Sequence, residues 1–280
     1  MRRNAKTTAK SFYKNNMNNN LQRLTLRIGR NTLSVLSQGE EENDLSFKPI
    51  VVKSGVSMAV NLRQAFKTCD ILMMPAARVR VLIDSDVLMV PIELFDEQTM
   101  AEMHNNAFPR QEQDAIFYNV LPDLNAVAVF AMNKDLKLVL DDHFRDVRLI
   151  SAMSPVWRHM HQRSYTGSRN KLFGYFHEGR LEIFSFKQNR FKFCNSFEAT
   201  RSKDALYFLI YVWNQLQLQQ RFDELYLMGD IPEKDWMTNE LKRYVQKVFV
   251  INPSAEFGEH PGTELKGVPF DLQTLIVKGR

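Results

Sequence analysis

Pairs of neighbouring carboxylates are the residues in this chain whose type and spacing could hold a metal ion. Asp84-Ser85-Asp86 places two of them one residue apart, a spacing that suits a hard cation such as Mg²⁺. The same three residues fit an ordinary turn between two strands, in which Asp caps its own backbone. Asp141-Asp142-His143 adds an imidazole, but adjacent side chains on a helix diverge. We expect a turn at the first group, a solvated helix end at the second, and a metal site at neither.

Histidine and cysteine spacing gives no metal site either. His159 and His161 fall in a segment with helical spacing, where residues two apart point about 200° apart. Cys69 recurs with apolar residues at helical spacing and is expected in the core. Cys194 lies on a predicted strand with no setting that lowers a thiol pKa, so we expect it to be inert. Two cysteines in a chain of 280 residues indicate a reducing compartment, and we expect the cytoplasm.

The sequence motifs that most often identify an active site do not occur in this chain. It contains no G-x-x-x-x-G-K-[ST], G-x-G-x-x-G, H-E-x-x-H, C-x-x-C or G-x-S-x-G. A run of phenylalanines could stack nucleic-acid bases, but its rings alternate between both faces of the predicted strands, which favours core packing. These rings are Phe184, Phe186, Phe191, Phe193 and Phe197. We therefore propose no nucleophile, no cofactor and no catalytic residue from motifs.

The charge of the chain is concentrated at its start. Lys and Arg number 37 and Asp and Glu 32, for a net charge of +5. Residues 1–20 hold five of the bases and no acid, which leaves 32 bases against 32 acids in the rest. We expect 1–20 to be a disordered basic tail, the one part suited to RNA or another polyanion. No apolar stretch is long enough to span a bilayer, so we expect no transmembrane segment.

The predicted strands and helices that position these residues follow the same order in both halves of the chain. A hairpin over Leu21–Ser37, turning at Gly29-Arg30-Asn31, precedes a third strand and a helix capped near Ser54. Strand and helix segments then alternate up to about residue 163. Residues 171–197 again predict three antiparallel strands, followed by a helix over 202–220 whose unbroken apolar run indicates burial nearly all round. A polar stretch at 164–170 separates the halves.

Three antiparallel strands, a helix and βαβ units, repeated, predict an α/β protein with mixed sheets flanked by helices. We expect a first half over 21–165 and a second half over 166–280. This order, the opening hairpin and Leu227-Met228-Gly229-Asp230-Ile231-Pro232 resemble the actin-like ATPase fold, built from two ribonuclease-H-like halves. The chain resembles an uncharacterised bacterial family of that fold, distantly similar to the cytoplasmic actin-like proteins of pilus and secretion assembly.

The resemblance also identifies where a nucleotide site would lie. Active members carry Asp-x-Gly in the first hairpin of each half, and the Asp helps to hold a metal ion. This chain has Arg27-Ile28-Gly29 in the first half, and around Gly174 in the second half no acid but bulky rings. The adenosine motif keeps only Gly229, followed by Asp230. We therefore regard Arg27, Gly29, Gly174, Gly229 and Asp230 as a degenerate nucleotide site that binds neither metal nor cofactor.

The resemblance and these departures imply a scaffold or regulatory protein that binds a protein partner and is not an enzyme. One alternative is an active Mg-dependent ATPase or sugar-kinase-like enzyme that uses unusual acids, namely Asp84, Asp86, Asp141 or Asp230. A second alternative is an RNA- or ribosome-associated protein that works through its basic tail. The sequence leaves the partner and the oligomeric state open.

Overall fold

The computed structural model describes residues 22–39, 44–74, 76–109, 112–165, 167–187, 190–258 and 260–278. The expected tail over 1–20 lies outside these ranges. By their contacts the residues form two compact units, one of 1–28, 32–82 and 135–149 and one of 29–31, 83–134 and 150–280. The halves over 21–165 and 166–280 are defined by the order of elements and not by contacts, so that boundary stays a prediction. No helix in the described ranges is long and apolar enough to cross a membrane.

The first unit is built on a five-stranded sheet with the order β3-β2-β1-β4-β8. Its strands are β1 (Gln22–Ile28), β2 (Leu33–Gln38), β3 (Leu45–Ile50), β4 (Ala76–Ile83) and β8 (Val147–Ser151). Its helices are α2 (Met58–Thr68), α3 (Asp70–Met73) and α5 (Lys134–His143). The expected hairpin is confirmed, with Ile28 paired to Leu33 across the turn.

Helix α2 begins later than the sequence predicted. Its N-cap is Ser57, whose side chain accepts a hydrogen bond from the Val60 amide, and not Ser54. Gly55 has φ +81°, a left-handed conformation that a helix cannot contain, so the helix starts only after it. Cys69, at the end of α2, is 3% exposed, which confirms its predicted place in the core.

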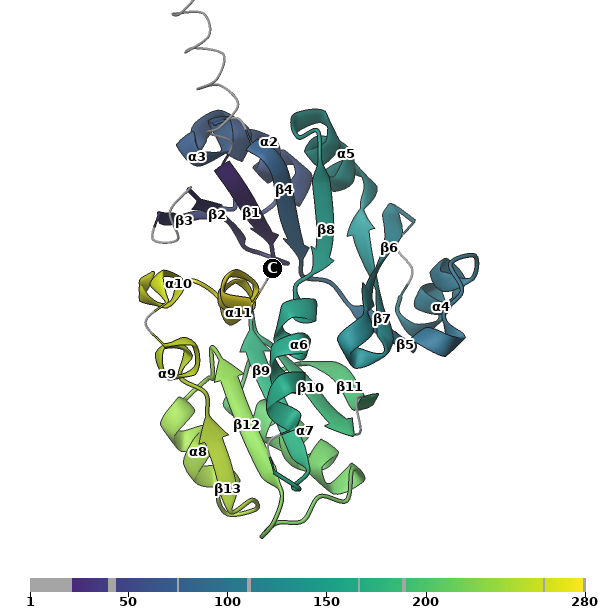
Figure 1. The fold of residues 1–280 in the computed structure, drawn as a ribbon, viewed down its shortest axis with the longest axis vertical. Coiled ribbons are helices and arrows are strands. Elements are labelled where there is room, and N and C mark those ends of the chain that lie inside the picture. Colours follow the sequence, from purple (N-terminus) through teal and green to yellow (C-terminus); the bar gives the residue numbers. More distant parts are fainter. Residues whose placement is uncertain are drawn as a thin grey trace, which may run out of the picture. The chain divides into compact units, whose positions relative to one another are not determined.

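The second unit contains a sheet with the same strand order, β11-β10-β9-β12-β13 (Figure 1). Its strands are β9 (Lys171–His177), β10 (Arg180–Lys187), β11 (Arg190–Glu198), β12 (Glu224–Gly229) and β13 (Lys247–Val250). The first three are antiparallel neighbours, and β12 runs parallel to both β9 and β13. Both five-stranded sheets therefore place the third, second, first, fourth and fifth strand side by side in that order.

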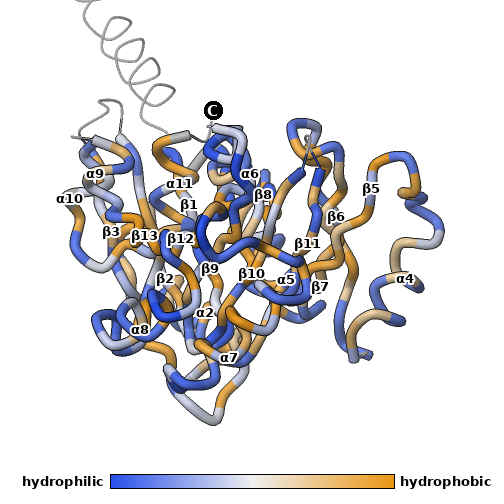
Figure 2. The backbone as a smooth tube through the Cα atoms, turned by 90° about the horizontal axis from the view of Figure 1, so that it is seen from below, coloured by the Kyte–Doolittle hydropathy of each residue, from blue (hydrophilic) through white to orange (hydrophobic). Residues whose placement is uncertain are grey.

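Helices cover both faces of this second sheet, so its strands are hydrophobic along much of their length (Figure 2). One face packs against α7 (Ser202–Gln215) and α8 (Lys234–Leu241) in a core that includes Leu209, Leu227 and Leu241. The other face packs against α6 (Met153–Ser164) in a core that includes Trp157 and Phe173. Helix α11 (Phe270–Lys278) lies against α6, and two short helices precede it, α9 (Pro253–Phe257) and α10 (Pro261–Glu264).

A three-stranded antiparallel sheet, β5-β7-β6, also belongs to the second unit. Its strands are β5 (Val87–Pro91), β6 (Asp114–Leu121) and β7 (Ala126–Asn133), and short 3₁₀ turns η1 (Ile92–Leu94) and η2 (Pro122–Leu124) follow β5 and β6. Helix α4 (Met100–Ala107) packs on this sheet around Val90, Val127 and Val129. These strands and α4 belong to the alternating strand and helix segments predicted before residue 163, and residues 97–99 ahead of α4 form a turn.

The environment of α7 corrects one expectation. Leu209 and Val212 are buried against the sheet, but Tyr207 is 62% exposed and Tyr211 47% exposed on the opposite side of the helix. The hydroxyl group lets a tyrosine ring lie at the surface, so an unbroken apolar and aromatic run does not require burial all round. In the Phe-rich strands, Phe184 and Phe186 are buried as predicted, and the rings on β11 are half-buried.

Candidate functional site

The most highly charged buried region lies at the turn between β9 and β10. Glu178 and Gly179 form a two-residue hairpin turn with φ +45° and +74°, which is the type I′ geometry favoured by twisted strands. Glu178 adopts a left-handed conformation that is unfavourable for a residue with a side chain. Its Oε2 accepts a hydrogen bond from the Asn31 amide at 3.1 Å, which stabilises the turn. The turn pairs His177 with Arg180 across the two strands.

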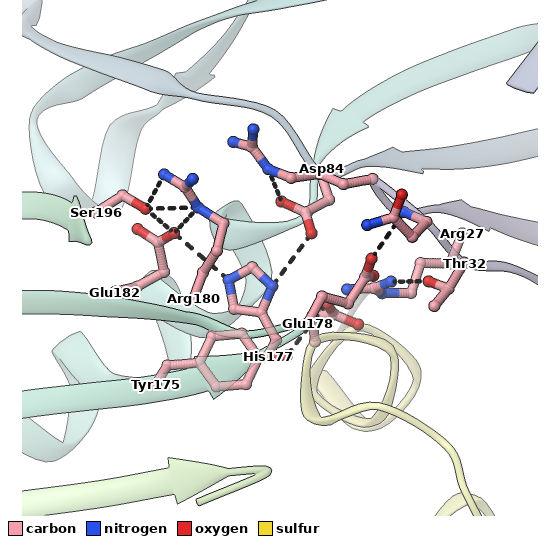
Figure 3. A network of polar contacts seen from close by, with 12 residues as sticks. Arg27, Thr32, Asp84, Tyr175, His177, Glu178, Arg180, Glu182 and Ser196 are labelled. Carbon is pink, nitrogen blue, oxygen red and sulfur yellow. Dashed lines mark hydrogen bonds and ion pairs between the residues drawn. The ribbon is translucent and has the colours of Figure 1, made fainter. Parts of the chain in front are cut away.

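His177 lies between two carboxylates and is 4% exposed (Figure 3). Its Nδ1 is 3.1 Å from Asp84 Oδ2, and its Nε2 is 3.4 Å from Glu182 Oε1. Burial alone would lower the pKa of His177, but the two carboxylates outweigh that effect and raise the pKa to about 10. The raised pKa favours the imidazolium form of the ring at neutral pH, with a carboxylate oxygen within 3.4 Å of each ring nitrogen.

The charges around His177 balance one another. Arg180 contacts Asp86 at 3.0 Å and Glu182 at 3.9 Å, and both its Nε and Nη2 donate to the Ser196 hydroxyl. Arg30 contacts Asp86 at 2.8 Å and Asp84 at 4.0 Å, within the same compact unit. His177, Arg180 and Arg30 thus match Asp84, Asp86 and Glu182, three cations and three carboxylates among the described residues. Among these six groups cations and carboxylates are therefore equal in number.

Aromatic and polar side chains pack next to this cluster of charged residues. The Tyr175 ring stacks on His177 with centroids 4.7 Å apart, and its hydroxyl donates to Asp271 Oδ2 at 3.2 Å. Asp271 is fully buried at the start of α11. On β11, desolvation raises the pKa of the Cys194 thiol and the charge of Glu182 raises it further, a setting in which a thiol is unreactive.

The geometry at His177 does not fit a bound Mg²⁺ nucleotide. The two carboxylates contact opposite nitrogens of the ring, so one metal ion cannot reach the imidazole and both acids together. The protonated ring also has no lone pair for a metal. Glu182 Oε1 also accepts a hydrogen bond from the Ser196 hydroxyl, and Asp86 Oδ1 contacts the guanidinium groups of Arg30 and Arg180, so a Mg²⁺ ion would have to compete with these donors for its oxygen ligands.

The predicted nucleotide-site residues of the first half lie on its opening hairpin. Arg27 is near the end of β1, is 2% exposed, and donates from Nη1 to the Thr32 hydroxyl at 3.1 Å. Gly29 follows two residues later in the turn. The second half has the same spacing in sequence: His177 is the last residue of β9, and Gly179 follows two residues later. The register differs, because His177 pairs with Arg180 next to the turn, whereas Arg27 pairs with Ser34, one pair before the closing pair Ile28–Leu33. A basic residue therefore precedes the turn glycine by two positions in both halves.

Gly174 is not part of this turn, contrary to its assignment from the sequence. It lies in the middle of β9, where an added Cβ would be 3.1 Å from Leu209 and 3.3 Å from Leu181 and Leu227. Its small size serves packing under α7. The glycine of the turn between β9 and β10 is Gly179, which is not among the predicted nucleotide-site residues. The signal was present, since His177-x-Gly179 repeats the spacing of Arg27-x-Gly29.

Gly229 ends β12 in a position that no other residue could take without movement. Its φ is +84°, and an added Cβ would lie 2.1 Å from the Phe176 carbonyl oxygen. The next amide, that of Asp230, donates to the same oxygen at 2.9 Å. The Asp230 residue itself is exposed. The glycine therefore allows close approach of two strand ends directly beside His177.

The other candidates lie apart from the cluster, except Asp84 and Asp86. These two form the expected turn between β4 and β5, but their carboxylates also belong to the cluster. Asp141 to His143 form an exposed helix end, as predicted. His159 and His161 lie on α6 with different partners: His159 contacts Glu256 at 2.9 Å, and His161 Nε2 is 3.3 Å from the Tyr165 hydroxyl.

Two sheets with the same strand order, each opening on an antiparallel hairpin, define the actin-like ATPase fold. The chain belongs to the family described as protein of unknown function DUF3822, whose model matches residues 12–248. A search of curated proteins found no match.

Solved structures confirm the fold. A Bacteroides thetaiotaomicron protein described as having an actin-like ATPase fold and unknown function is 25% identical, with a TM-score of 0.80 over 93% of this chain and 97% of that chain. A chain of the PilM–PilN type IV pilus biogenesis complex is 11% identical, with a TM-score of 0.54 over 92% of this chain and 95% of that chain. The second likeness concerns the fold alone.

Proposed function

We propose that this chain is a non-catalytic actin-like scaffold or regulatory protein that works in the cytoplasm by binding a protein partner. The observation that carries the proposal is the basic side chain two residues before the turn glycine of both halves, Arg27 before Gly29 and His177 before Gly179. Active proteins of this fold have an acid there. Arginine and protonated histidine cannot ligate a metal ion, so the metal-dependent step has no ligand at either position.

The ion cluster supports the same proposal. The His177 imidazolium supplies a positive charge between Asp84 and Glu182 that is part of the chain itself. A group held in this way is present at all times and is not exchanged with solvent. A protein with this arrangement has no nucleotide cycle at the second turn, which suits a binding role better than turnover.

The PilM–PilN complex adds support for a protein partner. Its description places a chain of similar fold in an assembly with another protein. At 11% identity this is a likeness of fold, and it gives no identity for the partner of the present chain. The proposal is therefore restricted to a protein partner, with neither a metal nor a nucleotide as cofactor.

Thermal unfolding tests the proposal. The chain is heated alone, with Mg²⁺ alone, and with Mg-ATP or Mg-ADP at about 1 mM; a ligand at about 100 times its Kd adds about 2.7 kcal/mol to the folded state. For a chain of this size that is a rise in Tm of about 5–10 °C. We expect no rise with either nucleotide beyond that seen with Mg²⁺ alone. A nucleotide-dependent rise of that size would overturn the proposal and direct attention to the acids as ligands.

A further inference from the structure

A groove of about 340 Å³ lies between α2 and α5 within the first unit. Its lining comes from both helices: Arg63, Phe66 and Lys67 from the first, and Val139, Asp142 and His143 from the second. The groove is separate from the His177 cluster, which belongs to the second unit. Its volume suits one or two large side chains.

The floor of the groove is flat and aromatic. The rings of Phe66 and His143 stack with centroids 3.7 Å apart and an interplanar angle of 7°. Phe144 meets both rings edge-on, and His143 Nε2 is 3.2 Å from the Leu72 carbonyl oxygen, which holds the imidazole in place. A rigid aromatic face of this kind favours stacking with another ring or packing with a large aliphatic side chain.

The rim on the α2 side is basic. Arg63 and Lys67 are four residues apart, so they lie next to each other on one face of the helix, and both are exposed. Helix α2 contains no acid. Among the described residues neither cation has an ion-pair partner within 4.0 Å, whereas Arg78 and Lys137 of the same unit pair with Asp146 and Asp141. Asp142 of α5 also lines the groove but forms no ion pair with either cation among the described residues, so the lining carries two positive charges and one negative charge.

We propose that this groove docks a short acidic segment of a partner protein, which places one aromatic or large aliphatic side chain against Phe66 and His143. This proposal rests on the proposed function, since it assumes a protein partner and names its chemistry. Acidic residues beside that side chain would contact Arg63 and Lys67. An apolar floor with a charged rim is the arrangement in which one buried side chain gives affinity and the rim gives specificity and a fast association rate.

Selection from a random peptide library displayed on phage tests the proposal with the full chain as bait. We expect the selected peptides to share acidic residues around an aromatic or large aliphatic residue. The best peptide is then synthesised, and its Kd is measured by fluorescence polarisation at about 0.15 M salt and at higher salt, where screening weakens exposed ion pairs.

Four variants make the measurement specific. The double variant Arg63→Glu/Lys67→Glu reverses the rim charge, and His143→Ala removes half of the aromatic floor. The pair Lys48→Glu/Lys53→Glu, used with the single change Lys48→Glu, is the control, because it makes the same change in net charge at two exposed positions that do not line the groove. Arg63, Lys67, Lys48 and Lys53 are exposed, so circular dichroism and Tm of the charge variants should stay close to those of the unaltered chain. His143→Ala also loses the contacts with Phe66 and Phe144, so its circular dichroism must match that of the unaltered chain before its Kd is compared.

We expect the Arg63→Glu/Lys67→Glu variant to weaken binding by about tenfold or more and the two control variants by about twofold or less. His143→Ala should weaken binding without changing its salt dependence. Selection of basic peptides, selection of none, or a peptide that binds the Arg63→Glu/Lys67→Glu variant as tightly as the unaltered chain would each overturn the groove as the docking site. In the last case the proposed function would stand, whereas a nucleotide-dependent rise in Tm would remove it whatever the peptides show.

Discussion

His177 is a buried cation whose two neighbours depend on its charge. Replacement by Gln removes that charge and leaves the Asp84 and Glu182 carboxylates buried without their main counter-charge. Breaking a buried ion pair in this way costs about 3–5 kcal/mol. We expect His177→Gln to lower the free energy of unfolding by that amount in urea denaturation at neutral pH.

A double-mutant cycle separates the ion cluster from simple packing. His177→Gln combined with Asp84→Asn removes both members of one pair, so the double variant should be more stable than the sum of the two single changes predicts. If the effects add within about 0.5 kcal/mol, the two residues are not coupled and the cluster does not hold the turn.

The pKa of His177 also predicts how stability changes with pH. The folded value of about 10 is above the ordinary value of 6.5, so the folded state binds the proton more tightly than the unfolded state. This contribution is complete below about pH 6.5 and is lost as the pH rises through about 10. Stability should therefore fall over this range by up to about 1.4 kcal/mol per pH unit from this one group. Because other groups titrate there too, the measurement is the difference between the unaltered chain and His177→Gln, which should shrink as the pH rises.

A substitution at Gly229 tests whether the ends of β9 and β12 must lie close together beside His177. Gly229→Ala must move the Phe176 carbonyl, because the added Cβ would lie 2.1 Å from its oxygen, in addition to the strain of φ +84°. Gly267→Ala is the control, since Gly267 has φ +77° but no atom near the added Cβ. The control should cost about 1–2 kcal/mol from backbone strain alone, and Gly229→Ala clearly more, both measured by urea unfolding. If the two variants lose the same free energy of unfolding, the ends of β9 and β12 can move apart without loss of stability.

At the level of elements, α7 shows how far an apolar run can be interpreted from sequence. One side of this helix is buried and the other carries exposed tyrosines. Leu209→Ala should therefore lower the free energy of unfolding by about 2–5 kcal/mol. Tyr207→Gln, two residues earlier, should change it by about 0.5 kcal/mol or less. A large loss for Tyr207→Gln would restore the expectation of a helix buried on all sides. Urea denaturation of the two variants gives both values.

The sequence predicted where the strands and turns lie better than it predicted which side chains come into contact. The turns after β1 and β9 were predicted from glycine and from alternating hydrophobicity, because these signals act within a few residues. The ion cluster could not be predicted, since it joins Asp84 to residues nearly a hundred positions later in the chain. Gly174 was assigned to a degenerate nucleotide site by resemblance to the actin-like fold, and the structure places it and the rings beside it in the interior of β9, away from the turn.

On the scale of the whole molecule, the repeated strand order is visible in the structure although the two halves share no evident sequence repeat. Strand order depends on which segments are hydrophobic and where turns fall, and many sequences satisfy that pattern. A fold can therefore be shared with active actin-like proteins without the residues that hold a metal ion, which is what we propose for this chain. What remains shared is a framework with two hairpin turns, each preceded by a basic residue in this chain.

The charge of the whole chain makes a last prediction that is independent of its fold. Residues 1–20 hold five bases and no acid, so deleting them lowers the net charge from +5 to zero. Binding to a polyanion by counterion release should therefore depend on this segment, with a salt dependence that reflects at most about five phosphate contacts. We expect the full chain to be retained on heparin at low salt and the shortened chain to pass through at the same salt concentration. The Arg63→Glu/Lys67→Glu variant is the control: it lowers the net charge by four but keeps the segment, and should still be retained, though more weakly. If the shortened chain binds as strongly as the full chain, the basic residues of the body supply the contact and an RNA-binding role through the tail is excluded.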